Sequence, residues 1–137
     1  MRRFLLGVIV AGAVAAALAW PRINDVETGR TPEYPDLQVR TYPRDVATVA
    51  KAAQRAVERL PRWTFVGAGQ GPGGAEVHAV HKTLVFRFSD DVTVRVRAAG
   101  GRATLSVRSK SRAGQWDFGQ NARNIRELLA ELDRDLR

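Results

Sequence analysis

The sequence predicts an α+β fold: a two-layer sandwich in which two helices cover one face of an antiparallel sheet of about four strands, preceded by an N-terminal hydrophobic helix. Three observations predict it. Apolar residues recur at helical spacing over 46–60 and 125–136, and they alternate with polar residues over much of 63–112. In addition, 15 of the 17 residues at 4–20 are apolar. The α+β domain itself is expected to span 45–137.

Composition restricts the chemistry that the chain can perform. It has 137 residues, enough for one domain, and no cysteine, which excludes disulfides, thiolate metal sites and a catalytic thiol. Two histidines are too few for most metal sites, and no group of side chains resembles a catalytic triad. We therefore expect no metal, no cofactor and no enzymatic activity.

The first twenty residues have the layout of an export signal. Arg2 and Arg3 precede the apolar run 4–20. As a helix, this run would measure about 25 Å, slightly less than the roughly 30 Å hydrocarbon core of a bilayer. Because small residues form an A-x-A cleavage pattern at 17–19, two outcomes stay open: a membrane anchor, or secretion after cleavage. In both, the domain is expected on the periplasmic, extracytoplasmic side.

Residues 21–44 are expected to form an extended linker. They contain four prolines and mixed charges, and they show no apolar period.

Two amphipathic helices are expected to flank the sheet segment. Asp45 is a predicted N-cap of the first helix, and Pro61 ends it. Asn121 is the predicted cap of the second. The apolar stripe of the second helix consists of Ile125, Leu128, Leu129, Leu132 and Leu136.

Four stretches are expected to form the strands, namely 63–66, 76–88, 92–97 and 103–108. The glycine-rich segment 67–74 is interpreted as a flexible hairpin loop. Ser89, Asp90 and Asp91 are interpreted as a turn, because short polar side chains bond to nearby backbone amides. His78 and His81 should point to opposite faces of a strand, which argues against a metal pair.

The positive charge is concentrated in the predicted sheet. The net charge is +8, and residues 62–112 hold nine Lys or Arg against three Asp or Glu. If the alternation places Phe86, Phe88, Val92, Val94 and Val96 against the helices, the basic residues point outward: Arg87, Arg95, Arg97, Arg102, Arg108, Lys110 and Arg112.

A cationic sheet face would favour anionic partners, such as an anionic lipid, a polymer or an envelope protein. Arg95, Arg97 and Arg108 are the candidate contact residues. The alternative is a face that is merely solvated. Nucleic acid is not expected, because the outward positions lack aromatic residues for stacking.

The segment 109–121 is the second candidate site. Arg112 and Asp117 could pair across it, and the amides at the start of the following helix, near Asn121, could hold a small anion. The alternative is a capped connection that only shapes the fold. An enzyme that uses Asp117 with Arg112 is the weakest hypothesis, because a nucleophile and a second base are missing.

Five motifs occur in an order that has a counterpart in a known family: Tyr34-Pro35-Asp36-Leu37, Arg40-Thr41-Tyr42-Pro43, Leu60-Pro61-Arg62-Trp63, the segment 86–92, and the segment 109–121. Over 34–133 the chain resembles the bacterial and plastid domain-of-unknown-function family number 1499. The resemblance implies an exported or membrane-tethered domain and no known activity. In the family's loop pattern, Trp116 stands where a small serine is usual.

These observations together predict a non-enzymatic accessory or interaction module held at the membrane through residues 4–20. The alternative is a module that binds a small anionic ligand with the 109–121 loop.

Overall fold

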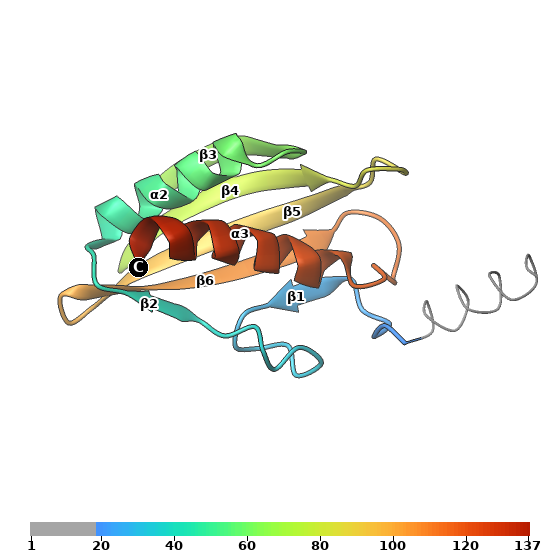
Figure 1. Cartoon of the computed structure of the whole chain (residues 1–137), viewed down its shortest axis with the longest axis horizontal. Helices are drawn as coiled ribbons and strands as arrows, with labels where there is room; N and C mark the ends of the chain where they lie inside the picture. The colour runs from blue at the N-terminus through green and yellow to red at the C-terminus, as the bar shows by residue number, and fades with distance from the viewer. Residues whose placement is uncertain (1–18) are drawn as a thin grey trace, which may run out of the picture.

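The computed structural model describes residues 19–137 as an antiparallel sheet covered on one face by two helices. The elements are β1 (Asp25–Glu27), β2 (Arg40–Tyr42), α2 (Val46–Arg59), β3 (Trp63–Gly71), β4 (Gly74–Lys82), β5 (Ser89–Ala99), β6 (Arg102–Ser111) and α3 (Gln120–Leu136). The strand order is β1-β6-β5-β4-β3, and β2 also pairs with β6 (Figure 1). This architecture confirms the α+β class, with six strands rather than about four.

The predicted N-terminal hydrophobic helix over residues 4–20 lies outside the described residues, apart from its last two positions. Within 19–137, no helix is both long enough and apolar enough to cross a membrane.

Both helices bury the faces that their spacing predicts. The carboxylate of Asp45 accepts a hydrogen bond of 2.7 Å from the amide of Thr48, which confirms the predicted cap of α2. The five leucine and isoleucine side chains of the predicted α3 stripe are all buried. They belong to the same buried core as the inward-facing valines and leucine of the sheet, namely Val92, Val94, Val96, Leu105 and Val107.

The glycine-rich segment 67–74 is largely strand rather than loop. β3 continues to Gly71 and pairs with β4 up to Gly74, after a bulge between Phe65 and Gly67. Gly74 allows a close approach of β5, because a Cβ atom there would lie 1.8 Å from the carbonyl oxygen of Val96.

Phe86 and Phe88 do not face the helices, so this part of the predicted alternation is wrong. They lie in the β4–β5 loop (residues 83–88), where their exposed fractions are 74% and 53%. The loop closes on itself, because the amide of Phe88 donates to the hydroxyl of Thr83. Arg87 adopts a left-handed backbone with φ of 57°, which interrupts the strand.

The predicted turn at Asp90 and Asp91 is also wrong, since both residues belong to β5. Asp90 takes the inward position before Val92 and is buried, whereas Asp91 points to the opposite face and is exposed.

Residues 21–44, expected as a linker, instead contribute to the sheet and the core. β1 and β2 both pair with β6. The buried apolar side chains of this segment are Val26, Tyr34, Leu37 and Tyr42. The prolines break the segment into short pieces, so no period is visible, yet these four side chains belong to the hydrophobic core of the domain.

Candidate functional site

A pocket of about 460 Å³ lies at one end of the sheet, between the β4–β5 loop and the β6–α3 loop (residues 112–119). Figure 1 shows both loops at the end of the molecule opposite the β5–β6 turn. The lining residues are Thr83, Leu84, Val85, Phe86, Phe88, Asp90, Ser111, Ala113, Gly114, Trp116, Asp117, Phe118 and Gln120.

The walls of the pocket are apolar and largely aromatic. The rings of Phe86 and Phe88 stack with their centroids 5.5 Å apart, and those of Trp116 and Phe118 stack at 4.4 Å. Leu84 and Val85 extend the first wall and are exposed. Such a contiguous apolar surface is uncommon on a free protein and is typical of a binding site.

The polar floor is acidic. Among the residues of 19–137 that line the pocket, only Asp90 and Asp117 are charged. Asp90 is 1% exposed; its Oδ2 accepts a hydrogen bond of 2.9 Å from Asn124 Nδ2 and lies 3.5 Å from His81 Nδ1. His81 is equally buried and packs edge-on against Trp63.

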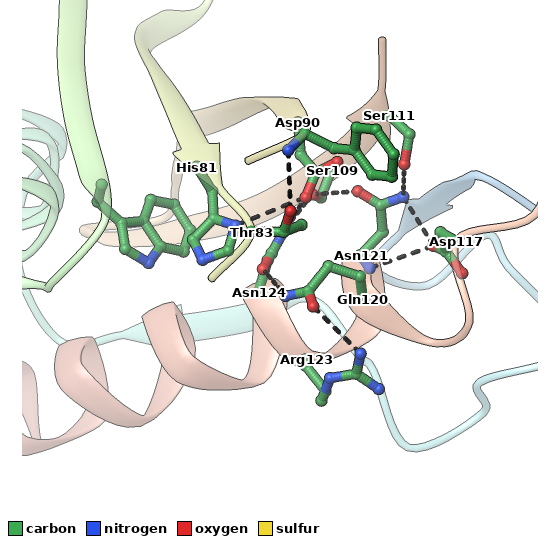
Figure 2. Close-up of polar contacts among 12 residues, drawn as sticks. His81, Thr83, Asp90, Ser109, Ser111, Asp117, Gln120, Asn121, Arg123 and Asn124 are labelled. Atoms are coloured by element: carbon green, nitrogen blue, oxygen red, sulfur yellow. Dashed lines mark hydrogen bonds and ion pairs between the residues drawn. The ribbon is translucent and has the colours of Figure 1, made fainter. Parts of the chain in front are cut away.

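A chain of buried amides and hydroxyls continues from Asp90 under the start of α3 (Figure 2). Asn124 Nδ2 also lies 3.2 Å from Ser109 Oγ, which in turn donates to Asn121 Oδ1 at 2.7 Å. Asn121 Nδ2 lies within hydrogen-bond distance of Ser111 Oγ and Asp117 Oδ2. The network holds the pocket floor in one geometry, because each polar group restricts its neighbours.

Asp117 performs the capping that was predicted for Asn121. Its two carboxylate oxygens accept from the amides of Gly119 at 2.8 Å and of Asn121 at 3.1 Å. Asn121 itself lies inside the first turn of α3 and is buried. The amides that were expected to hold a small anion are therefore already occupied by a side chain of the protein.

Arg112 does not pair with Asp117, so that prediction is wrong. Its guanidinium contacts both carboxylate oxygens of Asp91, with nitrogen–oxygen distances of 2.8–3.1 Å. The hydrogen bonds from Arg112 hold the pKa of Asp91 below its ordinary value. Arg112 does not line the pocket.

The outward sheet face is not uniformly cationic. Arg95 pairs with Glu76 at 3.0 Å, and Arg108 pairs with Asp25 at 2.6 Å. The hydrogen bonds from these arginines lower the pKa values of both carboxyls.

Of the three arginines proposed as contact residues on this face, only Arg97 makes no ion pair within the part of the chain that the structure describes. Asp25 lies in the segment expected as a linker, so its neutralising charge was not foreseen.

The first described residues lie at the pocket end of the molecule (Figure 1). The ring of Trp20 is so close to Gly119 that a Cβ atom there would lie 2.9 Å from it. The guanidinium of Arg22 lies 4.9 Å from the ring centroid of Trp116, and that of Arg123 lies 5.6 Å from the centroid of Trp20. Trp20 is the last residue of the apolar run 4–20.

Sequence reasoning missed the buried network, although the sequence carries a signal for it. His81, Asp90 and Ser109 each belong to the inward-facing alternation of their strand, in which the neighbouring inward residues are apolar. Polar residues in such positions must find partners. Across 19–137, no group of three or more acidic, histidine or cysteine residues could hold a metal ion.

No curated protein and no solved structure is detectably similar to the chain. Residues 15–132 match a protein family of unknown function, DUF1499. Because the match covers most of the chain, the protein belongs to the DUF1499 family.

Proposed function

We propose that the chain is a non-enzymatic, membrane-tethered binding domain on the extracytoplasmic side, and that its pocket end contacts the bilayer. One observation carries this proposal. Six of the eight large apolar residues that are exposed in the described chain gather at that end: Trp20, Leu84, Val85, Phe86, Phe88 and Phe118. Trp20, the last residue of the apolar run 4–20, lies against Gly119 at the same end.

The energetics favour contact between this end and lipid. Transfer of apolar surface out of water contributes about 25 cal/mol per Å², so partial burial of several such side chains contributes a few kcal/mol. Arg22, Arg87 and Arg123 flank the apolar surface in sequence or space. Arginines beside a surface that contacts lipid can bind lipid phosphates, and each contributes roughly 1 kcal/mol to the binding of an anionic membrane surface.

The sheet face supports a contact role less well. Arg95 and Arg108 pair with carboxylates, which leaves fewer guanidinium groups for an anionic partner. The anionic-ligand alternative is also weaker, since the pocket near 109–121 is lined by carboxylates and not by Arg112.

Fluorescence quenching by lipids tests the bilayer contact. Because the chain has no native cysteine, a Phe86→Cys variant of the full chain can carry a single fluorophore after reconstitution in vesicles. We expect strong quenching by lipids with a quencher in the upper acyl chain, and little quenching for Ala98→Cys at the other end of β5. Equal quenching at the two positions would refute the contact.

Reporter fusions test on which side of the membrane the domain lies. A reporter that is active only outside the cytoplasm, fused to the C-terminus, should be active, because Arg2 and Arg3 should remain inside. Activity of a cytoplasmic reporter instead would overturn the extracytoplasmic assignment.

A further inference from the structure

We infer that the pocket between the β4–β5 and β6–α3 loops is a binding site for a cationic amphiphile, a molecule with an apolar body and a protonated amine at one end. This goes beyond the bilayer contact and does not depend on it. The inference rests on the charge of the floor, the chemistry of the walls and the size of the space.

The negative charge of the pocket floor disfavours anionic ligands and favours ligands that donate hydrogen bonds. Asp90 and Asp117 are its only charged groups. Both oxygens of Asp117 accept from backbone amides at the start of α3, those of Gly119 and Asn121. In contrast, Oδ1 of Asp90 accepts no hydrogen bond from residues 19–137 and is not fully enclosed, and Asp90 borders the pocket. A buried carboxylate is costly unless it is paired, and an ammonium group of a ligand would pair it.

Within residues 19–137, His81 is the one basic side chain within 4 Å of the Asp90 carboxylate, and it approaches the other oxygen, Oδ2. His81 does not line the pocket. It therefore leaves the pocket side of the carboxylate available to a ligand, while Asn124 holds the carboxylate in position.

The walls suit the same ligand. Four aromatic residues surround the space, namely Phe86, Phe88, Trp116 and Phe118. Aromatic faces attract cations and bury apolar groups, so they can accommodate both parts of a cationic amphiphile; the ring of Trp116 already has the guanidinium of Arg22 over it, which leaves the phenylalanine rings for the ligand. The volume of about 460 Å³ lies within the range of sites for small organic ligands.

Three probes with one apolar body test the assignment: phenylbutylamine, phenylbutanol and phenylbutyrate. Binding to the full chain in zwitterionic nanodiscs is measured by ligand-observed NMR, with empty nanodiscs subtracted. We expect the amine to bind at least about tenfold more tightly than the carboxylate, because two like charges would otherwise face each other. The alcohol should bind with intermediate affinity.

Two variants separate the contributions of floor and walls. Asp90→Asn should remove most of the amine's advantage over the alcohol, and it should leave the quenching of a fluorophore at residue 86 unchanged. The double variant Phe86→Ala/Phe88→Ala should weaken all three probes. Its matched control, Val39→Ala/Val66→Ala, removes two exposed apolar side chains elsewhere and should change nothing.

Two results would overturn the inference. One is a carboxylate probe that binds as tightly as the amine. The other is an unchanged amine preference in Asp90→Asn, in a protein whose circular dichroism shows a folded domain. Because the quenching experiment uses no ligand, its failure and the failure of this site are distinguishable.

Discussion

Asp90 illustrates how a single residue connects the fold to the site. The alternation of β5 turns it inward, where Asn124 donates a hydrogen bond to its carboxylate and His81 Nδ1 lies 3.5 Å from it. The same position makes it part of the pocket floor. Its burial is therefore both a cost to folding and a means of recognising a donor.

Asn124→Ala should destabilise the domain by about 1–3 kcal/mol, because it leaves a buried carboxylate oxygen without its donor. The measurement is the free energy of unfolding from a urea titration followed by tryptophan fluorescence. The control is Gln54→Ala on α2, which removes only an exposed hydrogen bond to Glu58. Equal stabilities of the two variants would contradict the structural role of the network.

The pair between Asp25 and Arg108 predicts a pH dependence. The pKa of Asp25 is lowered in the folded state, mainly by the hydrogen bonds from Arg108. As the pH falls, Asp25 therefore takes up a proton in the unfolded state before it does so in the folded state. The stabilisation from the pair is fully present above about pH 5, and it is lost as the pH falls through the lowered pKa of the folded state.

Arg108→Gln should consequently lose less stability than the wild type between about pH 6 and pH 3, by less than about 1 kcal/mol, since the pair is partly exposed. Urea titrations of both proteins across this range measure the difference. An acid sensitivity in the variant as steep as that of the wild type would count against the pair.

At the scale of elements, the start of α3 depends on a residue outside the helix. Gly119 takes a left-handed conformation with φ of 78° and provides no side-chain cap, so Asp117 provides the acceptors instead.

Asp117→Ala should therefore destabilise the domain by about 1–2 kcal/mol, whereas Asp117→Asn, which keeps an acceptor oxygen, should cost less. Thermal unfolding followed by circular dichroism compares the two variants. An Asn variant as unstable as the Ala variant would show that the capping oxygen is not what matters.

The elements also show how much the sequence could reveal. The helices, the inward valines of β5 and the alternation of β6 follow from local periodicity, and the structure confirms them. β1 and β2 have three residues each, too few to show a period, and their pairing with β6 is a tertiary property.

The candidate site was less predictable for a related reason. Asp117 and Asn121 were identified from the sequence, but their roles depend on contacts between segments distant in the chain. The partner of Arg112 proved to be Asp91, on the neighbouring strand, because strand register rather than loop proximity brings the two side chains together. The pocket itself required two loops that lie 24 or more residues apart.

Val26→Ala tests whether β1 belongs to the folded unit. Val26 is fully buried, so the loss of two methyl groups should cost at least about 1.5 kcal/mol. Val39→Ala, in the same segment but 44% exposed, is the control and should cost little. Equal unfolding free energies for the two variants would mean that 21–44 does behave as a linker.

For the whole molecule, the exposed apolar residues and the direction of the strands define how the domain is oriented relative to the bilayer. The β4–β5 and β6–α3 loops, which form the pocket, lie at one end, and the β5–β6 turn lies at the other (Figure 1). β5 has 11 residues, and at about 3.3 Å per residue it separates the two ends by roughly 35 Å. A domain that contacts the bilayer with its pocket end would therefore hold the β5–β6 turn well away from the lipid.

Energy transfer to headgroup-labelled lipids is the most direct test of this central claim. A donor fluorophore is attached to one of two single-cysteine variants of the full chain, Phe86→Cys or Arg102→Cys, and each variant is reconstituted in vesicles. Residue 102 lies at the β5–β6 turn. The proposal predicts efficient transfer from residue 86 and weak transfer from residue 102. Similar transfer from both positions would mean that the domain lies flat, with its sheet face on the membrane, and would contradict the proposed orientation.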